Sequence, residues 1–188
     1  MRKLVYYIAT SIDGYIAGPG GEFDFYPVAD DMAAYINGEY PEMVPTPVRD
    51  QIGFDAPNKR FDTVIMGRGS YEPGLAVGYS SPYAHLRQYV VSGTIKSVDD
   101  PAVELVPDDP IGLVRRLKQE QGGDIYLCGG GNLAAQLLPE IDEMIIKCYP
   151  VVAGEGIPVF HGSFNPTTFT LTGTRTFSNG TVLMTYTR

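Results

Sequence analysis

The amino-acid sequence predicts an α/β fold with a mostly parallel central sheet of about eight strands and helices on both faces. One observation is that short apolar runs, typical of strands buried on both faces, alternate with segments of helical spacing. The other lies at the end of the chain, where two strand-like segments, residues 169–177 and 181–187, flank the turn pair Asn179-Gly180. This pattern predicts an antiparallel hairpin at one edge of the sheet.

The first third of the chain contains one buried strand and one helix. Residues 3–9 form an almost continuous apolar run, which predicts a strand. Residues 10–26 contain four glycines and no periodicity, and a loop of this length in a compact domain is more often functional than idle. Residues 30–38 have helical spacing, whereas residues 39–60 are interpreted only as a helix fragment or a surface excursion.

The rest of the chain alternates strands with helices. Asp109 followed by Pro110 is a strong helix start, and Gly122-Gly123 ends that helix. A second, short helix is expected over residues 132–138. The apolar runs that predict strands cover residues 63–66, 88–91, 103–106, 124–128 and 142–152.

Length and charge limit the classes of function. A chain of 188 residues without repeats or a linker is expected to form a single domain over residues 1–188. The net charge is −8, with 14 Lys and Arg against 22 Asp and Glu, and no basic run exceeds two residues. Nucleic acid is therefore not an expected partner. No apolar stretch approaches the ~20 residues of a membrane span, so no membrane partner is expected.

The two cysteines indicate a reducing compartment. Cys128 and Cys148 both lie inside apolar runs, as buried free thiols do. This usage predicts a cytoplasmic protein. Because His85 and His161 are the only histidines and no Cys-x-x-Cys pair occurs, no metal site is expected.

Three glycines follow the predicted strand at residues 124–128. Gly129, Gly130 and Gly131 lie where this strand gives way to a helix. Glycine lets the backbone approach a ligand closely, and a helix N-terminus offers free N–H groups to a phosphate. A tight turn alone also favours glycine, but three in a row exceed what a turn needs. We therefore favour an anion site here.

Two further strand ends carry groups that bind phosphate. Gly67, Arg68 and Ser70 follow the strand at residues 63–66, and Ser92 follows the strand at residues 88–91. A guanidinium and hydroxyls suit a phosphate, although Arg68 could equally be a surface residue at a helix start. Together the strand ends predict a dinucleotide that lies across the carboxyl edge of the sheet.

Three segments carry a resemblance to a known family. Residues 9–18 (ATSIDGYIAG), 65–72 (IMGRGSYE) and 125–133 (IYLCGGGNL) resemble, in this order, the dihydrofolate reductase superfamily. Residues 142–143 and 150–160 are similar to a strand and the following loop in the branch that contains the reductase domain of the riboflavin-biosynthesis deaminase/reductase. The resemblance covers nearly the whole chain and implies the dihydrofolate reductase-like fold, with NADPH as the cofactor.

The resemblance also implies positions that contact the cofactor. The backbones of Ala9 and Ile16 match positions beside the nicotinamide carboxamide. Gly93 stands where the family often has Arg, so the preference between NADPH and NADH stays open, with Lys96 as a possible compensating cation. The matching phosphate-binding positions are Gly67, Arg68 and Ser70 at the adenosine phosphate, Ser92 at the 2′-phosphate, and Gly129, Gly130, Gly131, Asn132 and Leu133 at the pyrophosphate.

Two carboxylates are the candidate catalytic residues. Dihydrofolate reductases place a substrate-binding carboxylate at the start of the first helix, five residues after a loop tryptophan. Phe25 replaces that tryptophan here, and the same spacing leads to Asp30, with Asp31 as the adjacent alternative. Asp13, in the Ser-Ile-Asp-Gly segment, is the second candidate. The alternative roles are a solvated helix-start acid for Asp30 and a turn former for Asp13.

These observations predict an NADPH-dependent oxidoreductase that transfers a hydride to a pteridine-like, pyrimidine-like or other small heterocyclic or carbonyl substrate. One alternative is a catalytically silent nucleotide-binding protein of the same fold. Another is a true dihydrofolate reductase, against which the missing tryptophan argues. The deaminase zinc motif is absent, so no deaminase activity is expected. The resemblance further implies a homodimer.

Overall fold

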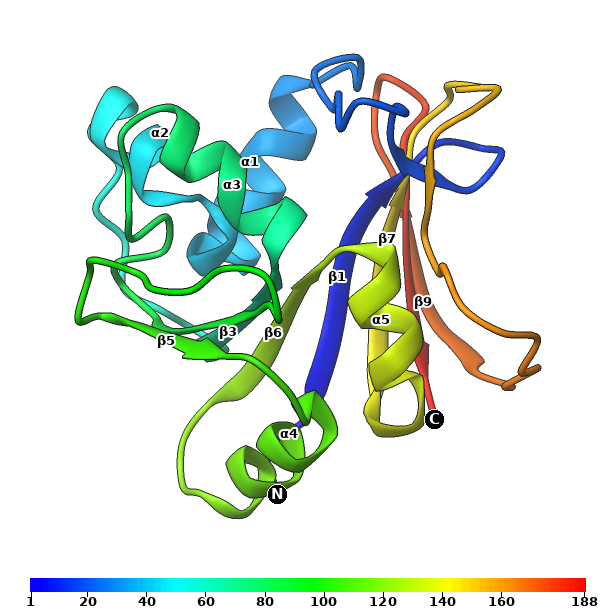
Figure 1. The fold of residues 1–188 in the computed structure, drawn as a ribbon. Helices are drawn as coiled ribbons and strands as arrows, with labels where there is room; N and C mark the ends of the chain where they lie inside the picture. The colour runs from blue at the N-terminus through cyan, green and yellow to red at the C-terminus, as the bar shows by residue number, and fades with distance from the viewer.

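The computed structural model describes residues 1–188 and contains an eight-stranded central sheet with the strand order β5-β4-β3-β6-β1-β7-β10-β9 (Figure 1). Its parallel strands are β1 (Leu4–Thr10), β3 (Phe61–Gly67), β4 (Arg87–Val91), β5 (Val103–Val106), β6 (Asp124–Gly129) and β7 (Glu143–Cys148). The C-terminal hairpin of β9 (Thr170–Thr176) and β10 (Val182–Thr187) is antiparallel and joins the sheet through β7. The predicted sheet and its antiparallel edge are confirmed.

Helices cover both faces of the sheet. They are α1 (Asp30–Glu39), α2 (Thr46–Ile52), α3 (Arg68–Ala76), α4 (Pro110–Gln119), α5 (Gly131–Leu137) and the short 3-10 helices η1 (Pro41–Met43) and η2 (Leu138–Glu140). Successive residues of a strand point to opposite faces. Leu4 of β1 packs in a cluster with residues of α4 and α5, whereas Val5 packs in a second cluster with Met32 of α1 and Tyr71 of α3.

Helix α4 forms where its end signals predict it. The Asp109 side chain accepts a hydrogen bond from the Gly112 N–H at 2.9 Å, and Pro110 occupies the first turn. Leu113, Val114 and Leu117 are buried on one face of the helix. The cap satisfies an N–H group that the helix leaves free, and the apolar stripe holds the helix against the sheet.

Two expectations from the sequence need correction. The strand predicted over residues 142–152 ends at Cys148, because the chain turns there and the Val151 N–H bonds the Tyr149 carbonyl at 2.8 Å. The segment read as a loop over residues 10–26 contains β2 (Tyr15–Ala17), which pairs with β8 (Ile157–Pro158). Strands this short have no measurable period, so the sequence pattern did not predict them.

Strands β1 and β6 separate towards their carboxyl ends. Their pairing stops at Tyr6 and Leu127, whereas β1 continues beside β7 as far as the pair Thr10 and Cys148 (Figure 1). We call this place the β1–β6 fork, bounded by residues 7–10 of β1 and residues 128–129 of β6. The fork opens the edge of the sheet where the predicted cofactor segments end.

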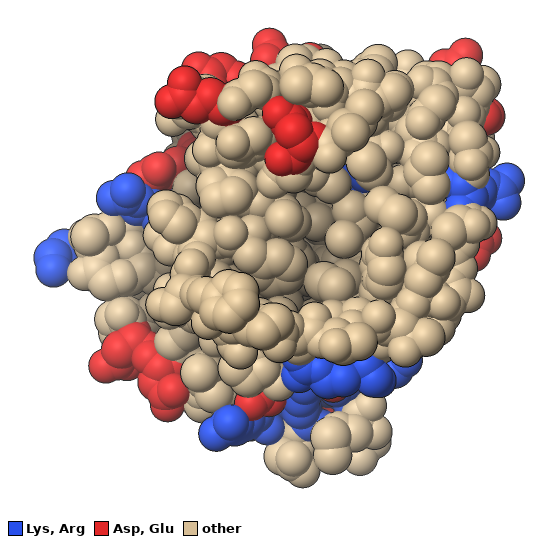
Figure 2. Space-filling view, turned by 90° about the vertical axis from the view of Figure 1, so that its right-hand side faces the viewer, with Lys and Arg blue, Asp and Glu red and all other residues tan.

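Charged side chains are unevenly spread over one side of the molecule. Figure 2 shows a face whose middle is hollowed and carries few charged side chains, with acidic groups towards the top and a row of basic groups near the bottom. None of the helices combines the length and apolar character that a membrane crossing requires.

Candidate functional site

The ends of β3 and β6 meet at the carboxyl edge of the sheet. A Cβ atom added to Gly67 would lie 3.3 Å from the Gly129 carbonyl oxygen and 3.5 Å from the Gly130 nitrogen. The two glycine segments, more than 60 positions apart in the sequence, therefore pack backbone against backbone. Each leads directly into a helix, β3 into α3 and β6 into α5.

Both helices begin without a capping side chain. Gly67 and Gly130 are the N-cap residues of α3 and α5, and neither helix start receives a side-chain hydrogen bond. The first-turn N–H groups of a helix have no partner within the helix and carry partial positive charge. Two such helix starts side by side form a place where two linked phosphates can accept hydrogen bonds.

The three consecutive glycines have different surroundings. Gly129 has a φ of 116°, a left-handed conformation that favours glycine, and its peptide bond to Gly130 is cis. A Cβ on Gly131 would overlap the Pro158 carbonyl oxygen, so this glycine serves packing against β8. A Cβ on Gly130 would meet only Ile16 Cδ1, at 3.6 Å. Gly130 is thus the position of the three where a ligand can approach the backbone.

Arg68 and Thr94 are exposed neighbours beside these helix starts. The Arg68 guanidinium contacts Thr94 Oγ1 at 3.3 Å and Glu72 at 3.5 Å, and neither contact is short. Ser92 is buried, and its hydroxyl accepts from the N–H groups of Thr94 and Ile95. Ser92 therefore shapes the turn, while Thr94, which the sequence interpretation missed, presents the exposed hydroxyl.

The remaining predicted cofactor positions also reach this edge. Ala9 lies on β1 beyond the last pair with β6, and the Ile16 side chain points towards Gly130. Ser70 Oγ lies 3.8 Å from a Cβ placed on Gly129, so this hydroxyl faces the glycine segment. In the first turn of α5, Asn132 is exposed and Leu133 is buried beneath it. The fold thus brings segments of β1, β2, β3, β4 and β6 to one edge.

Asp13 connects two loops. Its carboxylate accepts hydrogen bonds from the Ala153 N–H at 3.0 Å and from the Gly154 N–H at 2.7 Å. A hydrogen bond with the Ser11 side chain and these backbone contacts lower the pKa of Asp13 to about 2. These contacts favour the turn role over proton donation, because a carboxylate of low pKa holds no proton near neutral pH.

The two acids at the start of α1 differ in their contacts. Asp31 accepts from the Ser178 hydroxyl at 2.8 Å and from the Ser178 N–H at 2.9 Å, and these bonds lower its pKa. Asp31 therefore ties α1 to the turn between β9 and β10. Asp30 is exposed and forms no hydrogen bond through its side chain. The catalytic role of Asp30 stays a prediction.

Lys147 is a residue of this region that the sequence interpretation did not select. It pairs with Ala9 across β1 and β7, and its ammonium lies 4.9 Å from the centre of the Tyr7 ring. Burial lowers its pKa to about 8. A signal was present in the sequence, because Lys147 falls on the same buried face of β7 as Ile145. A lysine that interrupts the otherwise apolar run of residues 144–148 stands out from the core pattern.

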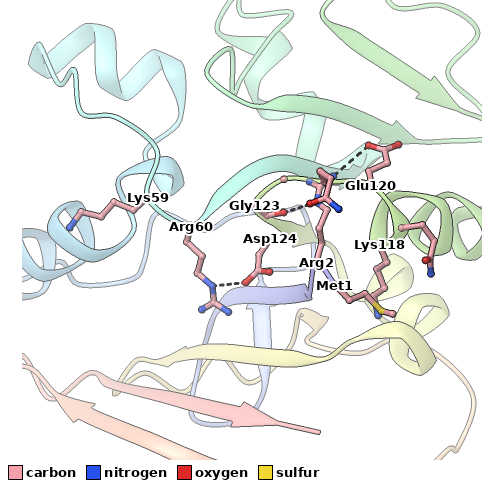
Figure 3. A pocket seen from close by; sticks show the side chains of 11 residues that line it. Met1, Arg2, Lys59, Arg60, Lys118, Glu120, Gly123 and Asp124 are labelled. Carbon is pink, nitrogen blue, oxygen red and sulfur yellow. Dashed lines mark hydrogen bonds and ion pairs between the residues drawn. The ribbon is translucent and has the colours of Figure 1, made fainter.

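A basic cavity of about 480 Å³ lies at the opposite, amino-terminal edge of the sheet (Figure 3). The basic side chains that line it bind other groups of the protein. Arg2 bonds Asp62 and the Gly123 carbonyl, and Lys118 contacts Asp142 at 2.7 Å. No group of three His, Cys, Asp or Glu side chains is placed to hold a metal ion.

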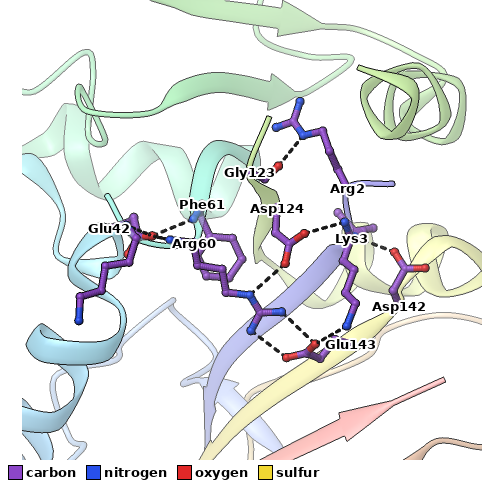
Figure 4. A network of polar contacts seen from close by, with 11 residues as sticks. Arg2, Lys3, Glu42, Arg60, Phe61, Gly123, Asp124, Asp142 and Glu143 are labelled. Carbon is purple, nitrogen blue, oxygen red and sulfur yellow. Dashed lines mark hydrogen bonds and ion pairs between the residues drawn. The ribbon is translucent and has the colours of Figure 1, made fainter. Parts of the chain in front are cut away.

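An ion-pair network continues from this cavity along the same edge (Figure 4). Arg60 holds Glu143 through two bonds of 2.9 Å and Asp124 through one of 3.0 Å. Lys3 Nζ contacts Glu143 at 3.3 Å. Because these charges neutralise one another and join β1, β6 and β7 to the start of β3, we assign a structural role to this edge.

Comparison with known proteins defines the class of this site. The chain matches the RibD C-terminal domain family over residues 2–183 and belongs to that family. It is 35% identical over 184 residues to the Bacillus subtilis protein YwjB, which is uncharacterized, with 97% of this chain and 96% of that protein covered. It is 28% identical over 198 residues to the uncharacterized B. subtilis protein YyaP, covering 98% and 94% of the two chains.

Solved structures show the same fold. A candidate riboflavin biosynthesis protein from Shewanella sp. PV-4 superposes with a TM-score of 0.73 at 25% identity, covering 99% and 98% of the two chains. The Thermotoga maritima diaminohydroxyphosphoribosylaminopyrimidine deaminase/5-amino-6-(5-phosphoribosylamino)uracil reductase gives 0.66 at 16% identity, covering 99% of this chain and 56% of that one. Enterococcus faecalis dihydrofolate reductase complexed with NADP(H) gives 0.66 at 14% identity, covering 99% and 96%. These likenesses confirm the dihydrofolate reductase-like fold.

Proposed function

We propose that this protein is an NADPH-dependent reductase that transfers a hydride to a small heterocyclic or carbonyl substrate. The observation that carries the proposal is the pairing of two uncapped helix starts, at Gly67 and Gly130, on adjacent strands of a dihydrofolate reductase-like sheet. Membership of a family of reductase domains supports the same chemistry.

The residues present fit a dinucleotide phosphate. In the proposal, the pyrophosphate accepts hydrogen bonds from the first-turn N–H groups of α5, above Gly130, where Ile16 Cδ1 is the one atom within 4 Å of an added Cβ. The 2′-phosphate lies against Arg68 and Thr94, whose side chains are exposed and only loosely engaged. The bound NADPH would supply the hydride; the chain binds it, orients it and keeps water out with residues 10–26.

The nicotinamide end is assigned to the β1–β6 fork. Ala9 and Ile16 contribute backbone and an apolar side chain there, and aromatic rings of Tyr7 and Tyr126 line the buried side at a centroid distance of 6.2 Å. A flat heterocycle packs well against such rings. The substrate is therefore proposed to lie on the α1 side of the sheet.

The experiment is an absorbance assay of NADPH oxidation at 340 nm against pteridines, pyrimidines and small carbonyl compounds, with calorimetric titration of NADPH in parallel. Turnover with any of these compounds supports a reductase. Tight NADPH binding with no turnover across the panel would favour the silent nucleotide-binding protein. Dihydrofolate as the best substrate, with tight methotrexate binding, would indicate a true dihydrofolate reductase.

We also propose that the protein is a cytoplasmic homodimer. All residues of the edge strand β9 are exposed or half-buried, and only one neighbour, β10, pairs with it. An unpaired edge without proline is a surface on which a second copy can add. Both cysteines are free thiols, as is usual in a reducing compartment.

A further inference from the structure

Lys147 reaches the Tyr7 side of the β1–β6 fork from the neighbouring strand β7. On β7 it stands between Ala9 of β1 and Leu183 of β10, on the face that also carries Tyr7. Its ammonium lies over the Tyr7 ring, and its charge acts on the thiol of Cys128 across the fork. The amine therefore extends from β7 across β1 towards β6.

This ammonium has no anionic partner in the protein. Lys3 and Lys118 form ion pairs, Lys59 bonds a carbonyl group and Lys96 is exposed. Lys147, by contrast, is half-buried and forms neither an ion pair nor a hydrogen bond. The contact with the Tyr7 ring offsets only part of the cost of removing a cation from water.

A second unsatisfied group belongs to the same ring. The Tyr7 hydroxyl is buried, with the residue only 4% exposed, and it has no hydrogen-bond partner. Buried polar groups are almost always paired, so this hydroxyl is an unmet donor beside the Lys147 ammonium, which has no partner in the protein but keeps contact with solvent. An acceptor oxygen at this place would pair with both groups. Both groups can donate: the ammonium carries three N–H bonds and the phenol one O–H.

We infer that Lys147, assisted by the Tyr7 hydroxyl, binds a negatively charged oxygen of a planar substrate, so that the substrate is the conjugate base of a weak acid. This inference rests on the proposed function for placing the substrate beside the nicotinamide. It also reverses the electrostatics expected from Asp30, because the charge beside the fork at Tyr7 is positive.

The ionisation of Lys147 sets the pH range for this binding. The titratable groups that face it are Tyr7 from β1 and Cys128 from β6, whereas β10 contributes the apolar Leu183. Burial lowers the pKa of Lys147 to about 8, so the amine is mostly charged at pH 7. An anion held beside it stabilises the charged form, and binding should weaken as the pH rises above 8.

The test uses 4-nitrophenol as a probe, because its anion is planar, carries a delocalised negative charge on oxygen and absorbs visible light. The probe is titrated into the wild type, Lys147→Met, Lys147→Arg and Tyr7→Phe, and 4-nitroanisole serves as a neutral probe of the same shape. Lys147→Met should weaken phenolate binding about tenfold or more, Lys147→Arg should retain most of it, and 4-nitroanisole should be insensitive to all three changes.

A second readout does not depend on the probe. The chain has five lysines, so selective ¹³C labelling resolves the Lys147 signal. Its titration midpoint should rise when 4-nitrophenolate is added. Equal phenolate affinity of the wild type and a folded Lys147→Met, or an unmoved midpoint, would overturn the inference.

NADPH titration of the same proteins separates this inference from the proposed function. Wild type and Lys147→Met should bind NADPH equally, because the amine is assigned to the substrate. If NADPH binds and only the phenolate effect is missing, the Lys147 inference alone is wrong. If the wild type binds no NADPH, the proposed function fails, and with it the placement of this anion site beside a nicotinamide.

Discussion

At the residue scale, three adjacent glycines are required for three different physical reasons. Gly129 needs a left-handed backbone, Gly131 needs room beside the Pro158 carbonyl, and only Gly130 leaves open space above its backbone. The sequence could predict that glycine is needed here but not which glycine serves a ligand. The neighbour of Gly131 comes from β8, almost 30 positions along the chain.

Arg68 should distinguish between the two nicotinamide dinucleotides. In Arg68→Ala the affinity for NADPH should fall roughly tenfold, because a charged hydrogen bond to the 2′-phosphate is lost, while the affinity for NADH changes little. Calorimetric titration measures both. Arg116→Ala on α4 removes the same charge from an exposed site and serves as the control. An equal loss for NADPH and NADH would remove the assignment of Arg68 to the 2′-phosphate.

Asp13 should stabilise the fold at neutral pH and lose that effect in acid. Its pKa is lowered from 3.8 to about 2, so its ionised form contributes stability above pH 3.8, which is lost as the pH falls towards 2. Asp13→Asn should therefore lower the free energy of unfolding at pH 6 more than at pH 2.5, as measured by urea denaturation. Asp24→Asn, at an exposed loop position, is the matched control. A loss that is the same at both pH values would contradict the assignment.

The partners of the acids could not be read from the sequence. Asp13 contacts Gly154 and Asp31 contacts Ser178, each about 140 positions away. The choice of Asp30 and Asp13 relied on motif position, which locates a residue along the chain but not its tertiary hydrogen bonds. The same limit applies to Lys147, whose place in the fork depends on the order of the strands.

At the element scale, most strands and helices could be predicted because their signals are local. The buried strands appear as apolar runs, and α4 carries its cap and its apolar stripe within ten residues. The pair of β2 and β8 joins segments about 140 residues apart through very few hydrogen bonds, so no local pattern marks it. The end of β7 depends in the same way on a turn that follows Cys148.

Glu143 should hold the amino-terminal edge of the sheet together. It is 5% exposed and accepts two bonds from Arg60 and one from Lys3. Glu143→Gln leaves part of the Arg60 charge without a partner, and the free energy of unfolding should fall by about 2–3 kcal/mol. Glu104→Gln, which breaks an exposed pair, should change it by less than about 0.5 kcal/mol. Urea denaturation compares them, and equal effects would contradict the structural role of this edge.

At the scale of the whole molecule, the exposed strand β9 predicts self-association. Light scattering at micromolar concentration should give twice the chain mass of 20.5 kDa. Leu171→Lys places a charge on the half-exposed Leu171 of this edge and should shift the mass towards the monomer. A monomer mass for the wild type would rule out the homodimer, and a dimer insensitive to Leu171→Lys would move the interface elsewhere.

The two edges of the sheet have different roles in this account. The amino-terminal edge holds paired charges that join strands, and the carboxyl edge holds free helix starts, a glycine segment and an unpaired lysine. The strand order could be expected from the family resemblance. This order places strand ends that are far apart in the sequence next to one another. A mostly parallel sheet places all its carboxyl ends on one side, which is why the candidate site could be located before its contacts were known.

The central claim is that NADPH binds over Gly130, and calorimetric titration of NADPH into the wild type and Gly130→Asp tests it most directly. The new side chain has room to fit, since its Cβ meets only Ile16 Cδ1 at 3.6 Å, but its carboxylate would face the pyrophosphate. Gly38→Asp, whose Cβ meets no atom within 4 Å, makes the same change on α1 as the control. We predict micromolar or tighter binding by the wild type and Gly38→Asp, and a loss of at least about tenfold in a folded Gly130→Asp. Unchanged NADPH affinity in Gly130→Asp would contradict the account.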